Sequence, residues 1–205
     1  MKIDVASINQ ALDNRTWDIG NKVLYDLCEN YPDHKNESAI AAKIWLIGRS
    51  YAAAIERRRK GHEKENSGDD FYYNVVIPKI KESEIDDWIT ESKNEPIDQY
   101  KIALQTHKRL MALFNEISGQ DKRSLASKYL HFHVPGKFFI FDSRAQRAVN
   151  DQVARFKSVP INTTCDPVYE HFFQKCLKHN EELSIAIGRK LTPREFDKIL
   201  LAATK

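Results

Sequence analysis

Along most of the chain, apolar residues recur every three or four positions, as on one face of an amphipathic helix. These stripes predict a helix between a Thr16 cap and Pro32, and further helices over about 37–59, 72–92, 97–117, 143–156 and 166–187. The clearest start signal is Thr192-Pro-Arg-Glu195, in which Thr192 can cap a helix and Glu195 can close a capping box. The pentapeptide 137–141 is the best strand candidate, and it is too isolated to build a sheet. The pattern therefore predicts an all-α, multi-helix globular fold.

The chain has 205 residues, enough for one helical domain or for two lobes, about 1–95 and 96–205, with a cleft between them. Residues about 60–70 are polar and flanked by glycine, which predicts an exposed mobile loop. No apolar run approaches the roughly 18 residues of a membrane span, and the first residues lack the apolar stretch of a signal peptide. We therefore expect a cytoplasmic protein that does not associate with membranes.

Three cysteines are widely spaced, and neither CxxC nor HExxH occurs. His131 and His133 are two residues apart in a predicted helix, so they lie on different faces. The sequence therefore gives no reason to expect a disulfide, a metal ion or another cofactor.

The net charge of +3 is unevenly distributed. Residues 121–160 carry eight lysines and arginines against three aspartates, and aromatic residues are interleaved with them. Such a segment suits phosphate contact and base stacking, although an ordinary solvated helix face has the same composition. The basic residues that we expect to contact nucleic acid are Lys122, Arg123, Lys137, Arg144 and Arg147.

Lys128 lies in a partly apolar predicted helix, at the border of the apolar face beside Leu125 and Phe132. Partial burial would disfavour its charged form and lower its pKa, which would make a free amine available as a nucleophile. A lysine whose stem only covers the edge of a helix interface would show the same pattern.

Asp142 follows the apolar run 138–141 and precedes a predicted helix. Capping that helix is its simplest role. A carboxylate fixed at this position could also stabilise a developing cation or activate a nucleophile, and the two roles are compatible. Arg144 and Arg147 follow in the first turns of the same helix, where they could meet phosphate.

The order of these features resembles the catalytic segment of helix-hairpin-helix DNA glycosylases, nearest to the archaeal 8-oxoguanine glycosylase branch. A helix with Lys128, a Pro-Gly turn, a hydrophobic run ending at Asp142 and then Arg144 cover roughly residues 118–150. The resemblance implies an all-helical fold of two lobes and excision of a modified base from DNA. In that reaction Lys128 would attack the sugar C1′ and Asp142 would assist, and a Schiff base would also allow strand nicking (AP-lyase activity).

The hairpin glycines of that family are largely missing, because Ser118-Gly119-Gln-Asp stands where Gly-x-Gly would be expected. This favours an alternative, a non-catalytic nucleic-acid-binding or protein-interaction protein on a degenerate glycosylase scaffold. Lys128 would then only cover an interface and Asp142 would only cap. Trp45, Tyr51 and Trp88 are candidates for stacking on a base, and each also suits a place in the core.

Overall fold

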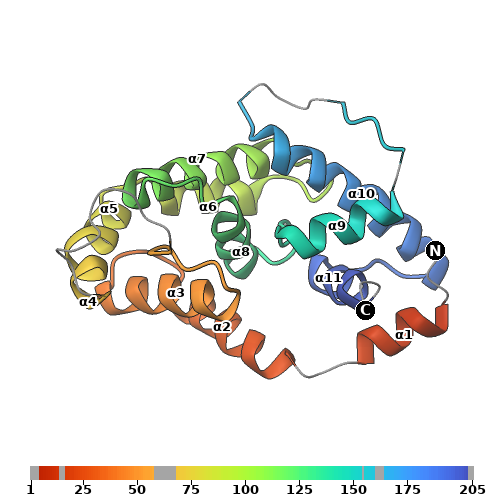
Figure 1. Cartoon of the computed structure of the whole chain (residues 1–205), viewed down its shortest axis with the longest axis horizontal. Coiled ribbons are helices and arrows are strands. Elements are labelled where there is room, and N and C mark those ends of the chain that lie inside the picture. The colour runs from red at the N-terminus through yellow and green to blue at the C-terminus, as the bar shows by residue number, and fades with distance from the viewer. Residues whose placement is uncertain (1–4, 14–16, 58–67, 154, 160–163, 203–205) are drawn as a thin grey trace.

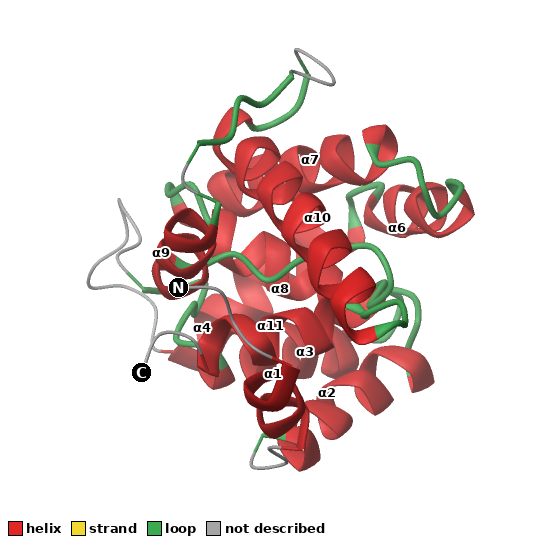
Figure 2. Ribbon diagram, turned by 90° about the vertical axis from the view of Figure 1, so that its right-hand side faces the viewer, coloured by secondary structure: helices red, strands yellow, loops and turns green. Residues whose placement is uncertain are grey.

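The computed structural model describes residues 5–13, 17–57, 68–153, 155–159 and 164–202. Within these ranges the regular elements are all helical, which confirms the predicted all-α fold (Figures 1 and 2). The elements are α1 (Val5–Asp13), α2 (Asp18–Asn30), α3 (Glu37–Ser50), α4 (Gly68–Phe71), the π-helix η1 (Tyr72–Val76), α5 (Ile77–Lys81), α6 (Ile85–Asn94), α7 (Lys101–Ser118), α8 (Arg123–His133), α9 (Ser143–Gln152), α10 (Pro167–Ile187) and α11 (Pro193–Ala202).

Local capping signals determine several helix ends. The backbone N–H of Glu195 donates to Thr192 Oγ1 at 3.2 Å, and the backbone N–H of Thr192 donates to Glu195 Oε2 at 2.9 Å. This is the predicted capping box, and it starts α11. At the other end of a helix, Gly119 has φ 66° and its N–H donates to the Asn115 carbonyl at 2.7 Å, which ends α7.

The helix predicted over 37–59 ends earlier, at Ser50. Ala52 has φ 51°, so the chain turns back on the helix, and the Ala53 N–H donates to the Gly48 carbonyl at 2.7 Å. A Cβ at Gly48 would lie 3.1 Å from the Cα of Ala54, so this close approach favours glycine. Helical periodicity in the sequence does not reveal such a contact.

The helix predicted over 72–92 is also divided. A π-helix and α5 lead to a break at residues 82–84, after which α6 begins at Ile85. The Ser83 hydroxyl donates to the Ile80 carbonyl at 2.7 Å and thereby occupies one of the last acceptors of α5. Of the segment predicted as a mobile loop, residues 60–67 lie outside the described residues, and Gly68 begins α4. Thr16, the predicted cap of α2, also lies outside them.

The buried apolar residues form two clusters. One contains residues of α2 to α8 and ends at Phe138, whereas the other joins α1 to α9, α10 and α11 and includes Phe139. Leu104 of α7 also belongs to the cluster that includes Phe139, and the two clusters meet along the chain between Phe138 and Phe139. Figure 1 shows the two groups of helices toward opposite ends of the long axis, with α1 beside α11. The segment between α8 and α9 connects them.

Candidate active site

Lys128 and Asp142 meet where the two clusters join. Lys128 lies on α8, and Asp142 is the N-cap residue of α9. The Lys128 Nζ lies 3.3 Å from Asp142 Oδ2, while Oδ1 accepts the backbone N–H groups of Arg144 at 3.0 Å and Ala145 at 2.9 Å. The two carboxylate oxygens thus have separate partners. The structure brings together the two residues that the sequence analysis singled out.

The Lys128 side chain is only 1% exposed, compared with 32% for Asp142. Its Nζ donates to Ser124 Oγ at 2.8 Å and to the Tyr51 carbonyl at 3.4 Å, and it lies 5.6 Å from the centre of the Tyr51 ring. Burial lowers the pKa of Lys128, although the neighbouring Asp142 carboxylate opposes that change. Burial thus disfavours the ammonium form of Lys128, whereas Asp142 favours it.

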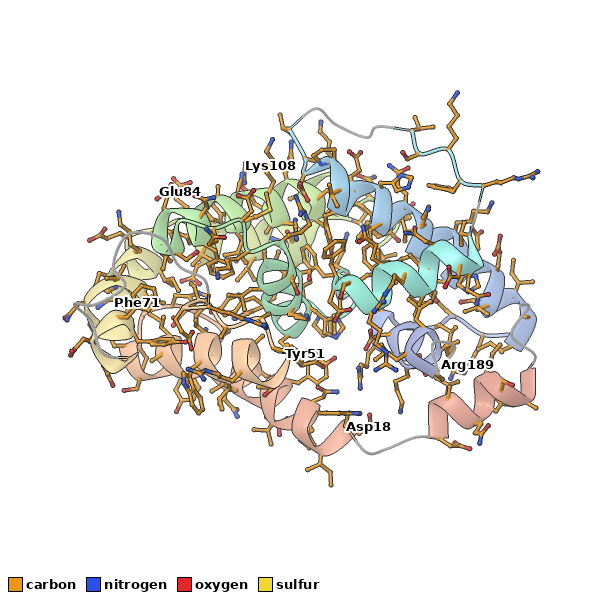
Figure 3. The ribbon with its side chains drawn as sticks, in the orientation of Figure 1. Asp18, Tyr51, Phe71, Glu84, Lys108 and Arg189 are labelled. Carbon is orange, nitrogen blue, oxygen red and sulfur yellow. The ribbon has the colours of Figure 1, made fainter. Side chains whose placement is uncertain are left out.

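Asp142 and Tyr51 line a pocket of about 330 Å³, which we call the Asp142 pocket. The N-terminal half of α2 and the end of α3 form one side, and α11 with the start of α9 forms the other. Tyr51 lies near the middle of the molecule and Asp18 at its lower edge in Figure 3. The volume lies near the lower end of the range for small-molecule sites. The lining residues are Trp17, Gly20, Asn21, Leu24, Ser50, Tyr51, Ile140, Asp142, Arg144, Arg194, Asp197 and Leu201.

Two buried polar pairs in this pocket were not found from the sequence. The Tyr51 hydroxyl donates to Asn21 Oδ1 at 2.6 Å, and no described residue accepts a hydrogen bond from the buried Asn21 Nδ2. Arg194 Nη1 lies 2.6 Å from Asp197 Oδ2. Burial raises the pKa of Asp197 to about 6, even though Arg194 favours the carboxylate. The sequence did hold a signal, because Asp197 lies on the apolar face of α11 with Phe196 and Leu200.

The five basic residues expected to contact nucleic acid do not gather at one place. Arg144 lines the Asp142 pocket, and Arg147 is exposed on α9. Lys122 lines a separate pocket beside Ser124, and its Nζ donates to the Arg57 carbonyl at 2.5 Å. Tyr51 also lines the Asp142 pocket, whereas Trp45 and Trp88, the other stacking candidates, do not.

Arg123 and Lys137 have structural partners instead. Arg123 Nη2 donates to Asp166 Oδ1 at 2.9 Å and its Nε lies 2.5 Å from Oδ2, while Asp166 caps α10. The Lys137 side chain is 4% exposed; its Nζ lies 3.3 Å from Glu95 Oε2 and donates to the carbonyls of Pro96 at 2.7 Å and Gln99 at 2.8 Å. These contacts join the 95–100 segment to the turn after α8 and use the lysine's donors.

His131, three residues after Lys128 on α8, also has structural partners. Its Nδ1 donates to the Phe138 carbonyl at 2.7 Å, so its Nε2 accepts from the Tyr25 hydroxyl at 2.6 Å. Burial lowers the pKa of His131 to about 4. Among the residues that the structure describes, no three His, Cys, Asp or Glu side chains are arranged to hold a metal ion.

None of the helices in the described ranges is long and apolar enough to cross a membrane. No family model matches the chain, and searches of curated proteins and of solved structures found no protein similar to it.

Proposed function

We propose that this chain is a DNA glycosylase-like protein that accepts an unstacked nucleotide in the Asp142 pocket and cleaves its N-glycosidic bond. The observation that supports the proposal is the position of Asp142, which pairs with the buried Lys128 and also lines the pocket. A carboxylate there would face the positive charge that develops on the sugar as the base departs. The Tyr51 ring in the same wall offers an apolar surface for a base.

In the proposed reaction the bond between C1′ and the base breaks, and its electron pair leaves with the base, which takes up a proton. The free amine of Lys128 then bonds to C1′ and loses a proton. Opening of the sugar ring gives a Schiff base, from which β-elimination nicks the strand. For this attack the Lys128 side chain must leave its contacts with Ser124 and the Tyr51 carbonyl.

The test is borohydride trapping on duplex DNA that carries an abasic site, because it needs no choice of base. We expect a covalent adduct with the native protein, no adduct with Lys128→Gln, and a strongly reduced yield with Asp142→Asn. Lys175→Gln is a matched control, since Lys175 is also 93% buried and its Nζ donates to Asn150 Oδ1 at 2.7 Å, away from the pocket. An adduct that persists in Lys128→Gln would contradict the assignment of the nucleophile.

One observation favours the non-catalytic alternative: the Lys128 side chain is 1% exposed and its ammonium already has three partners. In that case Lys128 only holds Asp142 and Tyr51 in place. Fluorescence anisotropy with a stable abasic analogue separates the two functions. Preference for the analogue over intact duplex, without any trapped adduct, would favour binding without chemistry. No preference and no adduct would contradict both functions.

A further inference from the structure

A second, smaller pocket adjoins the Asp142 pocket. It has a volume of about 140 Å³ and shares four wall residues with the larger one, namely Trp17, Arg144, Arg194 and Leu201. Its other lining residues are Ala11, Lys198 and Ala202. Because so much of the wall is shared, a ligand in the larger pocket would lie directly beside the smaller one.

This smaller pocket, which we call the basic pocket, has three basic side chains in its wall, from Arg144, Arg194 and Lys198. None of the described residues that line it is acidic. Arg144 is two residues from Asp142 at the start of α9, whereas Arg194 and Lys198 lie one turn apart on α11. Two helices, α9 and α11, therefore place basic side chains around the same small space.

Lys198 and Arg194 have groups that an anion in this space could bind. Lys198 Nζ donates to the Leu12 carbonyl at 2.8 Å and pairs with both carboxylate oxygens of Asp18, at 3.1 Å and 3.4 Å. Arg194 uses Nη1 on Asp197, and its buried Nε has no partner among the described residues. An anion in the basic pocket would accept from these groups and would compete with Asp18, which is partly exposed to solvent.

We propose that the basic pocket binds a backbone phosphate of the nucleotide whose sugar and base occupy the Asp142 pocket. This rests on the proposed function for the base and sugar, whereas the phosphate site itself rests on the three basic side chains. The contact fixes the nucleotide relative to Asp142, because Arg144 and Asp142 belong to the same helix start. Arg144 and Lys198 are thus positioning residues, and they do not touch the bond that breaks.

The proposal is tested with duplexes that contain a stable abasic analogue, in which the phosphate on its 5′ side, on its 3′ side, or neither is replaced by a neutral methylphosphonate. We expect one replacement to weaken binding by about tenfold in anisotropy, as for loss of a charge-assisted contact. The same replacement should have little effect in Arg144→Gln and Lys198→Gln. Lys178→Gln, an exposed lysine of α10, serves as the control and should retain the full effect.

Equal effects of the two replacements, or an undiminished effect in both variants, would overturn the phosphate site. A second experiment is independent of DNA: Trp17 lies in both pocket walls, so its fluorescence or NMR signal reports occupancy. We expect 2-deoxyribose 5-phosphate to bind more tightly than 2-deoxyribose, and Lys198→Gln to remove the difference. If the duplex shows no preference for the abasic analogue, the proposed function fails. In that case the phosphate site is judged by the sugars, and it fails as well if the two sugars bind equally to the native protein.

Discussion

At the scale of single residues, Asp142 combines a structural and a chemical role. One oxygen caps α9 through two backbone N–H groups, and the other faces Lys128. An asparagine can keep the capping oxygen while it removes the negative charge. The two roles of this residue can therefore be separated by the choice of substitution.

We expect Asp142→Ala to lower the free energy of unfolding by about 1–2 kcal/mol, because both cap hydrogen bonds are lost. Asp142→Asn should lower it by less than about 0.5 kcal/mol, since asparagine is as good an N-cap residue as aspartate. Urea unfolding of both variants measures the difference. Equal stabilities of the two variants would show that the cap contributes little.

Single residues also show what the sequence analysis could and could not predict. It identified Lys128 and Asp142 because a lysine at the edge of an apolar stripe and an aspartate before a helix are local patterns. It expected Lys137 to contact nucleic acid, because this lysine belongs to the basic, aromatic-rich segment 121–160. The structure shows that the partners of Lys137 lie in residues 95–99, about forty positions away in the chain. The role of Asn21 could not be predicted for the same reason. The hydroxyl that donates to its side chain belongs to Tyr51, which is 30 positions away in the chain.

At the scale of elements, α3 ends where the chain folds back on Gly48, and this close approach gives a prediction. We expect Gly48→Ala to lower the free energy of unfolding by about 1 kcal/mol, because the cost of crowding exceeds the gain in helix propensity. The crowded neighbour is backbone, at 3.1 Å from the new Cβ. Thermal or urea unfolding measures the loss.

Gly20→Ala is the matched control. Gly20 lies in α2, and no atom lies within 4 Å of the position that its Cβ would take. The alanine should raise the stability by up to about 1 kcal/mol, as expected in an exposed helix. Changes of the same sign in the two variants would contradict the account of how α3 ends.

The elements that were correctly predicted have local signals, such as the capping box of α11 and the Asn36 cap of α3, whose Oδ1 accepts from the Ala39 N–H at 2.9 Å. The breaks that were missed have no comparable signal in the neighbouring sequence. The end of α3 depends on a contact between turns of chain, and the π-helix before α5 continues the apolar pattern without a gap. Periodicity finds helices well and finds interruptions poorly.

At the scale of the whole molecule, buried histidines predict loss of stability in acid. Burial lowers the pKa of His107 and of His131 from 6.5 to about 4, so the unfolded chain takes up protons that the folded chain excludes. Their contribution to stability is complete above pH 6.5 and is lost as the pH falls toward 4. The difference is worth roughly 3 kcal/mol for each imidazole.

Asp197 acts in the opposite direction. Its pKa is raised from 3.8 to about 6, so the folded chain takes up this proton first and gains stability as the pH falls from 6 toward 3.8. The stability gained by protonation of one carboxyl group is smaller than the stability lost through the two imidazoles. We therefore expect the urea midpoint to be lower at about pH 5 than at about pH 7.5, and an unchanged or higher midpoint would contradict this balance.

The cluster that joins α1 to α9, α10 and α11 predicts that the stability of these helices depends on α1. Ile8 of α1 is fully buried in this cluster, against α11. Ile8→Ala should lower the free energy of unfolding by about 2–5 kcal/mol. Hydrogen exchange should accelerate in α9, α10 and α11 more than in α3 or α7. Ile19→Ala, at a residue 81% exposed, is the control and should change the stability by less than about 0.5 kcal/mol.

The sequence did not predict that α1 packs on α11, because nothing in either amphipathic pattern identifies its partner. The consequence concerns synthesis. The apolar residues of the cluster that ends at Phe138 can pack as soon as they leave the ribosome, whereas α1 has no place to pack until α11 has been translated. A short amphipathic helix is marginal in water on its own. We therefore expect α1 to fold only together with α11, although it is made before α2 to α10, and we expect its apolar face to stay accessible to chaperones until then.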